Sequence, residues 1–353
     1  MGEDGVFLVG DFKPDRLGAS YRRAFSEIGL HVGTYDMGTA VEKLTWIGRN
    51  RIAHRLSIRS LACRRAASKA LNRELVNCAV AFRSRRMLIL NGEWVMPETI
   101  EILRGEGYVI AVFHADNPLP PHYSNRPETL PVARGANLYL IWSERLAASL
   151  RVAGVPRVEV LPFGWDPDVF PYQGDSPQGT WPGVIFVGGW DREREEFLDE
   201  VSAHLPLRIF GPDYWGRRTR RGSRSRKCWQ GKALYMNEAA KVLREAAVTL
   251  NILRLQHSVD GAPDGVVMRS FEVPGAGGFL LATRSGVATE LFPEGVTGEY
   301  FGEVRECIAK CRRYIEAGDL RKTICEEAHK IVSERHRYID RARQVLLSME
   351  SLP

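Results

Sequence analysis

A short stretch of the sequence, residues 260–289, combines acidic residues, glycines and an arginine at spacings that suit a phosphorylated ligand. Gly265 stands at the expected start of a helix over 266–276. The first amides of a helix lack intrahelical partners and lie at the positive end of its dipole. The N–H groups near Gly265 and Val266 therefore suit a phosphate or diphosphate.

Charged side chains of the same stretch would complete such a site. Arg269 could add a charge-assisted hydrogen bond to a phosphate. Glu272 has a carboxylate that can accept from both vicinal hydroxyls of a ribose, and Asp264 precedes it with seven residues between them. An ordinary helix with Asp264 as its cap and Glu272 in solvent would show the same spacing. The spacing alone leaves both interpretations open.

The elements that must position these residues follow a βα rhythm that runs twice along the chain. Short apolar runs predict the strands, and segments of helical spacing separate them. Expected strands lie at 5–10, 31–35, 86–90, 108–113, 137–142 and 158–161 in the first half, and at 183–187, 207–210, 248–253 and 278–282 in the second. This order predicts two doubly wound α/β domains with parallel sheets.

Polar residues follow two expected strands of the first half. Asp11 and Lys13 come after the first strand, and His114, Asp116 and Asn117 come after the strand over 108–113. Ligands of such sheets bind at the carboxyl ends of the strands, here expected in a cleft between two facing domains. A lone His after a strand is more often a structural hydrogen-bond partner, so both alternatives stay open for His114.

The segment RSFEVPGAGGFLLAT (269–283), with TELFPEG (289–295) and YFG (300–302) behind it, resembles the C-terminal domain of the CgeB-like glycosyltransferases. These are relatives of the large group-1 enzymes, which have the GT-B fold and use nucleotide sugars. Further similar segments are WSERLAASLRVAGV (142–155), VLPFGWDPDVF (160–170), FVGG (186–189) and FHADNP (113–118). The resemblance covers about 86–345 and is weak over 36–85.

The resemblance implies roles for the acidic pair. Asp264 and Glu272 match the two acidic positions of the group-1 Glu-x7-Glu pattern, with Asp in place of the first Glu. Glu272 would bind the ribose of the donor. Asp264 would contact the transferred sugar, if its shorter side chain reaches it.

The resemblance also implies a diphosphate site after the first strand of the second half. Gly188 and Gly189 stand where the family has a glycine turn, and Arg192 or Arg194 stands where it has basic residues. The family's usual Arg…Lys pair is not clearly present, so this assignment remains an expectation.

Two further assignments depend on the same resemblance. Gly211 and Pro212 follow the strand that would flank the base, as a base contact or as a structural turn. If transfer inverts the sugar's configuration, His114 or Asp116 must accept the proton of the acceptor hydroxyl. If transfer retains it, the diphosphate itself can accept the proton, and the protein positions and stabilises charge.

The net charge of +6 is unevenly distributed. Segment 216–232 has eight basic residues and no acidic one, and segment 49–86 has eleven against the single Glu74. We expect 216–232 to be an exposed loop that aids an anionic or membrane-associated acceptor. For each segment, a solvated face is the simpler alternative.

Composition excludes several classes of protein. The chain is 44% hydrophobic over 353 residues, so it is not disordered as a whole. No apolar run approaches the roughly 20 residues that span a bilayer, and the N-terminus lacks the pattern of a secretory signal. The six cysteines are scattered, which favours reduced thiols in a cytoplasmic protein, with peripheral membrane attachment left open.

These observations predict a glycosyltransferase (EC 2.4 type) with a nucleotide-diphosphate sugar as donor, an unidentified acceptor, and no metal or other cofactor. The alternatives are a nucleic-acid or anionic-surface binding protein and a catalytically inactive GT-B scaffold. The expected domains are an acceptor-side domain over 1–165 with a basic helical insertion near 40–85, a linker over 166–182, a donor-binding domain over 183–333, and a helix over 334–353 that packs back on the first domain.

Overall fold

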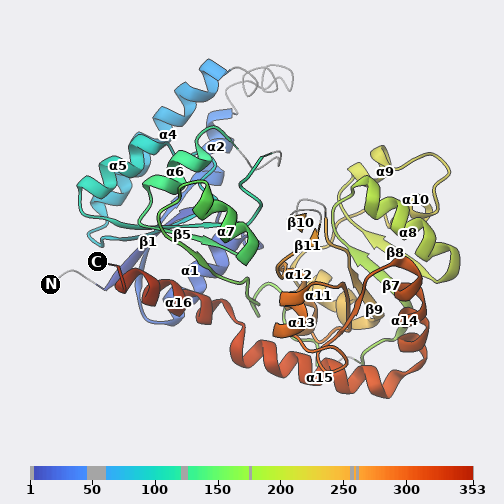
Figure 1. Ribbon diagram of the computed structural model, residues 1–353. Helices are drawn as coiled ribbons and strands as arrows, with labels where there is room; N and C mark the ends of the chain where they lie inside the picture. The colour runs from blue at the N-terminus through green and yellow to red at the C-terminus, as the bar shows by residue number, and fades with distance from the viewer. Residues whose placement is uncertain are drawn as a thin grey trace. The chain divides into compact units, whose positions relative to one another are not determined.

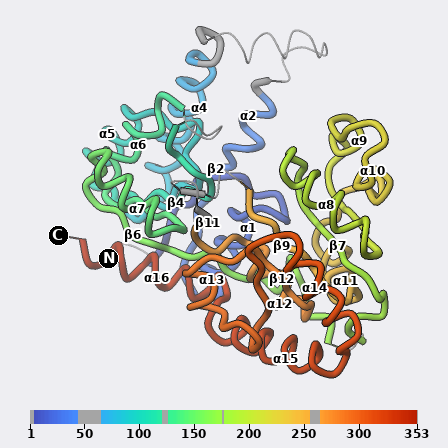
Figure 2. Tube along the Cα trace, turned by 45° about the vertical axis from the view of Figure 1, so that its right-hand side comes forward, coloured from blue at the N-terminus to red at the C-terminus, as the bar shows by residue number. Residues whose placement is uncertain are grey.

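The computed structural model describes residues 4–45, 61–120, 126–174, 177–254, 258–259 and 262–352. The chain divides into two compact units, Met1–Pro162 with Ile339–Pro353, and Phe163–Tyr338. Each unit contains its own parallel sheet (Figure 1), and Figure 2 labels elements of both units along the Cα trace. The predicted α/β class with two parallel sheets is confirmed.

The first unit has a six-stranded sheet in the order β2-β1-β3-β4-β5-β6, with every neighbouring pair parallel. All six residues of β1 are buried, as its apolar sequence requires. The strands are β1 (Gly5–Gly10), β2 (His31–Asp36), β3 (Arg86–Leu90), β4 (Val109–His114), β5 (Leu138–Ile141) and β6 (Val158–Val160). The helices are α1 (Leu17–Glu27), α2 (Met37–Thr45), α4 (Leu61–Ala81), α5 (Pro97–Gly105), α6 (Thr129–Gly135), α7 (Glu144–Val152) and α16 (Tyr338–Glu350). Residues 46–60 of the expected basic helical insertion lie outside the described residues.

The C-terminal helix α16 joins the first unit through polar contacts at the edge strand β6. Arg157 Nη2 donates to Ser351 Oγ over 2.8 Å, just beyond the end of α16. Ser348 Oγ donates to Glu159 Oε2 over 2.6 Å. These bonds tie the last turn of the chain to a strand almost 190 residues earlier.

The second unit has a five-stranded parallel sheet in the order β13-β12-β9-β7-β8. A short antiparallel pair, β10 (Ser258–Val259) and β11 (Ala262–Pro263), lies outside it. The sheet strands are β7 (Trp181–Val187), β8 (Leu207–Phe210), β9 (Ala246–Asn251), β12 (Leu280–Thr283) and β13 (Glu299–Phe301). The helices are α8 (Arg192–His204), α9 (Tyr214–Arg218), α10 (Arg224–Cys228), α11 (Met236–Glu245), α12 (Arg269–Gly275), α13 (Gly286–Leu291), α14 (Val304–Glu316) and α15 (Gly318–Arg335).

The Pro- and Gly-rich segment 166–182 belongs to the second unit, where its first residues and Trp165 pack on α12 and α15. Trp165 Nε1 donates to the Phe170 carbonyl over 2.8 Å, and the Trp165 ring meets His329 of α15 edge-on at 5.4 Å. A side chain at Gly275 would collide with the same indole. Composition identified a break in the βα rhythm here, but it could not identify these packing partners.

The expectation of a loop over 216–232 is wrong. The segment contains part of α9 and all of α10, and Trp215 at its start is fully buried. Trp215 Nε1 donates to the Gly188 carbonyl over 2.9 Å, and Trp229 Nε1 donates to the Gly211 carbonyl over 3.0 Å. These two indoles hold the segment on the sheet while its basic residues stay exposed.

The expected helix over 266–276 begins later than predicted. Gly265 has a φ of +69°, outside the right-handed helical region. The helix α12 starts only at Arg269. The amides near Gly265 and Val266 therefore belong to the loop before the helix and not to its first turn.

We predict that Trp215→Phe lowers the free energy of unfolding by about 1–3 kcal/mol, because it removes the indole N–H that donates to the half-buried Gly188 carbonyl. Urea unfolding followed by far-UV circular dichroism measures this. The control is Tyr235→Phe, which removes a hydroxyl from a side chain that is 58% exposed and should change stability by less than about 0.5 kcal/mol. Equal stability of Trp215→Phe and wild type would contradict the anchoring role.

Candidate functional site

A buried guanidinium joins the carboxyl ends of the two central strands of the second unit. Arg194, in the first turn of α8, donates from Nη1 to the Gly189 carbonyl after β7 over 3.1 Å. Its Nε donates to the Ile252 carbonyl after β9 over 3.0 Å. Asp191 is the N-cap of α8 and accepts from the Arg194 amide over 2.8 Å. Arg194 therefore fixes how the loops after β7 and β9 lie relative to each other.

Gly189 leaves room for a second arginine from the neighbouring strand. A side-chain carbon at Gly189 would overlap the guanidinium of Arg254, which follows β9, and would lie 2.8 Å from the Tyr214 hydroxyl. Arg254 Nε is 3.7 Å from Asp191 Oδ2, and the Arg254 side chain is 27% exposed. The absent side chain at Gly189 lets a partly exposed guanidinium cover the turn after β7.

Arg194, Arg254 and Arg269 form a cluster of positive charge. The pKa of Arg194 is lowered to about 9, mainly by burial and then by the charges of Arg254 and Arg269, while the charge of Asp191 acts in the opposite direction. The guanidinium of Arg194 donates to backbone carbonyls. The side chains of Arg254 and Arg269 are 27% and 21% exposed. The two partly exposed members can therefore reach an anionic ligand, while Arg194 fixes the loops after β7 and β9.

Glu272 lies one turn beyond Arg269 on α12 and is only 7% exposed. Arg269 Nη1 is 2.8 Å from Glu272 Oε2. The Arg269 guanidinium also faces the Phe170 ring at 5.7 Å. Burial raises the pKa of Glu272, and the charge of Arg269 acts in the opposite direction. The alternative interpretation, in which Glu272 lies in solvent on an ordinary helix, does not agree with this burial.

Three hydrogen bonds hold the loops around α12. Ser285 Oγ, after β12, donates to the Gly265 carbonyl over 3.0 Å. Asn251 Nδ2, at the end of β9, donates to Ser270 Oγ over 3.2 Å. The Leu253 amide donates to Thr283 Oγ1 over 3.2 Å. Asp264 and Val266, on either side of Gly265, are 4% and 3% exposed, so the loop is packed into the unit.

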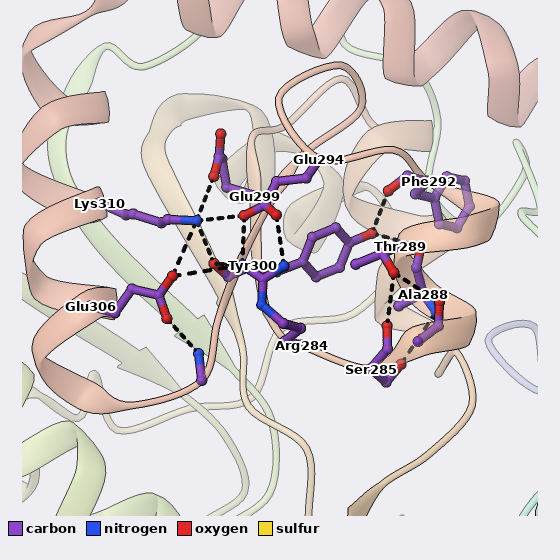
Figure 3. Close-up of polar contacts among 12 residues, drawn as sticks. Arg284, Ser285, Ala288, Thr289, Phe292, Glu294, Glu299, Tyr300, Glu306 and Lys310 are labelled. Carbon is purple, nitrogen blue, oxygen red and sulfur yellow. Dashed lines mark hydrogen bonds and ion pairs between the residues drawn. The ribbon is translucent and has the colours of Figure 1, made fainter.

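An ionic network lies next to Ser285, around β13 and the end of β12 (Figure 3). Next to Ser285, Arg284 makes a bidentate pair with Glu294, with distances of 2.7 and 2.8 Å. Lys310 of α14 lies among three carboxylates, with Nζ 2.5 Å from Glu294, 2.8 Å from Glu299 and 3.4 Å from Glu306. This network fixes the strand ends on which the loop over 264–266 depends.

The other predicted residues of the second unit have mainly structural contacts. Gly211 packs against Trp215, with no space for a side chain. Gly188 and Gly211 both accept from tryptophan indoles, and Pro212 accepts from the Trp215 amide over 3.0 Å. The side chain of Arg192 is 79% exposed and pairs with Glu196 over 3.1 Å on α8, so the structure does not bring it to the arginine cluster.

The predicted residues of the first unit each have contacts of their own within that unit. Lys13 Nζ is 2.5 Å from Glu42, and the Lys13 amide donates to Asp11 Oδ1 over 3.1 Å. A hydrogen bond to Glu42 raises the pKa of Lys13. Asn117 is buried, and its Oδ1 accepts from the Leu119 amide over 3.0 Å.

His114 is 1% exposed, and its Nδ1 lies 2.9 Å from the Asn91 carbonyl. A carbonyl can only accept, so Nδ1 carries the proton and Nε2 is left as an acceptor. Burial lowers the pKa of His114 and outweighs the Asn91 carbonyl and the charge of Asp116, which act in the opposite direction. The lowered pKa favours the neutral ring. Nε2 is buried, and no hydrogen-bond partner for it lies among the residues that the structure describes.

Sequence reasoning missed Arg254 and the positioning role of Arg194. The signal for Arg254 was its place directly after the apolar strand over 248–253, on the sheet edge where ligands bind.

Among the residues that the structure describes, no three His, Cys, Asp or Glu side chains gather as metal ligands. No helix in the same part of the chain is long and apolar enough to span a membrane.

Several solved structures are similar to this chain over nearly its whole length. Sucrose-phosphate synthase from Thermosynechococcus elongatus aligns over 99% of both chains, with a TM-score of 0.64 and 10% identity. HepE from Anabaena, solved in complex with UDP-glucose, covers 98% of this chain and 100% of its own, with a TM-score of 0.59 and 16% identity. A glycosyltransferase from Rickettsia africae covers 100% of this chain and 99% of its own, with a TM-score of 0.61 and 14% identity.

The fold is GT-B. Residues 192–347 also match the family model described as glycosyl transferase-like. This match includes α8 with Arg194, the loop with Arg254, α12 with Glu272 and the ionic network around Lys310. No curated protein sequence matches the chain.

The ionic network predicts a pH dependence of stability. Hydrogen bonds from Arg284 are the largest cause of the lowering of the Glu294 pKa from 4.5 to about 2, and Lys310 adds to it. A lowered pKa means that the pairing stabilises the fold above pH 4.5 and is lost as the pH falls toward 2. We therefore expect the difference in unfolding free energy between wild type and Glu294→Gln to be largest near neutral pH and to shrink steadily below pH 4.5.

Urea unfolding at a series of pH values tests this. Glu316→Gln is the matched control, because it removes the same charge from an exposed position on α14. It should cost little at any pH. A difference for Glu294→Gln that does not vary with pH would contradict the assignment of the pairing.

Proposed function

We propose that this protein transfers a sugar from a nucleotide-diphosphate sugar to an acceptor and that its second unit binds the donor. The resemblance of residues 269–283 supports the narrower proposal that it is a CgeB-like glycosyltransferase. The observation that carries the proposal is the arginine cluster beside the buried Glu272, at the carboxyl ends of β7 and β9. The match of residues 192–347 to a glycosyl transferase-like family supports it, as does the fold shared with UDP-glucose-bound HepE.

Each part of the donor has a proposed partner in the second unit. Arg254 and Arg269 bind the diphosphate, whose charge offsets theirs in a poorly solvated place. The amides near Gly265 and Val266 add uncharged donors to the same group. Glu272 accepts hydrogen bonds from the ribose, and its pairing with Arg269 orients its carboxylate for this.

Asp264 is proposed to contact the transferred sugar, and the turn at Gly211 and Pro212 to lie beside the base. Gly188, Gly189 and Arg194 are positioning residues, because their contacts fix the loops that carry the ligand-binding side chains. Arg192, which the sequence offered as an alternative to Arg194, has no part in this proposal.

In the first unit, Asp11, Lys13 and Asn117 are proposed for the acceptor side. His114 and Asp116 are the candidates for handling the proton of the acceptor hydroxyl. The bond from His114 Nδ1 to Asn91 leaves Nε2 to accept a proton, and the lowered pKa keeps the ring neutral until it does so. This proposed chemistry requires no metal.

The direct test of the proposed function is incubation with a panel of nucleotide-diphosphate sugars, beginning with UDP-glucose, and measurement of nucleotide release. Release from at least one donor, stimulated by an acceptor extract, supports a glycosyltransferase. Tight binding of a nucleotide with no release under any condition would favour an inactive scaffold. Binding of none of the panel would contradict the proposal.

We predict that Glu272→Ala weakens binding of free nucleoside diphosphate and of donor sugar alike, because both contain the ribose. The loss of a charged acceptor costs roughly 1.5–3 kcal/mol, or about 10- to 150-fold in affinity. Calorimetric titration measures both ligands. Glu272→Gln, which keeps the volume and one carbonyl acceptor, should lose less. Wild-type affinity in a folded Glu272→Ala protein would refute the ribose assignment.

We predict a different pattern for Arg254→Ala. It should weaken nucleoside diphosphate by about 10- to 150-fold, from a charged hydrogen bond of roughly 1.5–3 kcal/mol. It should leave the weak binding of the unphosphorylated nucleoside unchanged. Arg192→Ala is the control, since that side chain is 79% exposed and paired with Glu196. An equal effect of the two substitutions would show that net charge, and not the cluster, determines affinity.

A further inference from the structure

The segment that carries α9 and α10 is an ordered excursion from the edge strand β8. It leaves the strand at Gly211 and returns beside it, where the Gln230 amide donates to the Ile209 carbonyl over 2.9 Å. Figures 1 and 2 both show α9 and α10 together at the outer side of the second unit, with α8 next to α10. The segment is therefore attached to the sheet at both of its ends.

Two acidic side chains of α8 clamp this segment in place. Glu195, which is 1% exposed, accepts from both the amide and the Nε of Arg220, over 3.0 and 3.1 Å. Asp199 accepts from Ser223 Oγ and from the Ser225 amide, each over 2.7 Å. These bonds lower the pKa of Asp199, against the opposing effect of its burial. The segment has a fixed conformation and does not need to order itself when it binds a partner.

Of the basic residues in this segment, Arg220 bonds to Glu195, while several others are exposed to solvent. Arg221, Arg224, Arg226 and Lys227 are exposed, and we call these four residues the basic face. None of them has an acidic side chain within ion-pair distance in the described part of the chain. Arg226 makes one hydrogen bond, from Nη1 to the Thr219 carbonyl over 3.1 Å. Four exposed cations on a fixed surface, with no acidic neighbour to pair with among the described residues, are available to an anionic partner.

We propose that the basic face docks on the anionic surface of a phospholipid membrane. Each Lys or Arg near such a surface contributes about 1 kcal/mol, roughly a fivefold gain in partitioning, and the contributions add without a defined pocket. Binding to a headgroup layer requires exposed cations on a rigid element, and α10 with the turn before it carries four of them. This inference does not depend on the proposed transferase activity.

The aromatic residues of the segment argue against nucleic acid as the partner. Trp215 is fully buried, and Trp229 is partly buried against the core of the unit, so neither is an open platform for base stacking. Each of α9 and α10 has five residues, which is too short to place several side chains along a major groove. The basic face therefore matches a surface of headgroups better than a strand of bases.

Co-sedimentation of the whole protein with sucrose-loaded vesicles tests the proposal. We expect binding to vesicles of phosphatidylcholine with phosphatidylglycerol, no binding to phosphatidylcholine alone, and loss of binding at high salt. The triple variant Arg221→Ser, Arg224→Ser, Lys227→Ser should lower the partition coefficient by about 100-fold. Its far-UV circular dichroism should match wild type, because all three side chains are exposed.

The matched control, Arg312→Ser with Lys322→Ser and Lys330→Ser, removes the same charge from exposed positions on α14 and α15 and should retain most of the binding. Equal losses in the two triple variants would overturn the proposal, because net charge alone would then explain the binding. Equal binding to both kinds of vesicle would also overturn it. So would tighter binding of a short duplex DNA than of anionic vesicles, if the basic-face variant abolishes it.

Discussion

The buried guanidinium of Arg194 is the interaction on which the candidate site depends. A charged group in the interior is costly unless its donors are satisfied, and here the carbonyls of Gly189 and Ile252 accept from it. Because those carbonyls follow two neighbouring strands, the requirement to satisfy one arginine also fixes the ends of β7 and β9. The position of Arg254 over Gly189 follows from this constraint.

The charges around the candidate site favour an anionic ligand. Three arginines stand close enough that the charges of Arg254 and Arg269 lower the pKa of Arg194, while Glu272 and Asp191 supply the neighbouring negative charges. A diphosphate would relieve this repulsion, and the ribose next to it would meet a carboxylate already oriented by Arg269. The network around Lys310 has a different role. Its pairs join α14, β13, the loop before β13 and the end of β12, next to Ser285, which bonds to the Gly265 carbonyl.

Much of this arrangement could be predicted from the sequence. Apolar runs such as GVFLVG at residues 5–10 identified buried parallel strands, and the motif over 269–283 identified the helix that carries Glu272. The order of the elements was enough to predict the fold. The sequence misled the prediction where a polar composition suggested a loop but tertiary contacts order the segment. Segment 216–232 is polar and basic along its length, yet two indoles and two carboxylates of α8 order it.

The arginine cluster could not be predicted, because its members come from three separate loops and helices. Arg194 and Arg192 are equivalent in the sequence, and only the structure separates a buried guanidinium from one that is 79% exposed. Arg254 belongs to no motif, and its importance follows from the missing side chain at Gly189, 65 residues earlier.

A crystal structure of the whole protein with a bound nucleoside diphosphate would test the central claim most directly. The account predicts the diphosphate within hydrogen-bond distance of Arg254 and Arg269, the ribose hydroxyls on the carboxylate of Glu272, and Arg194 still bonded to the two carbonyls that it joins. A nucleotide bound away from the carboxyl ends of β7 and β9, or a diphosphate that contacts neither Arg254 nor Arg269, would contradict it.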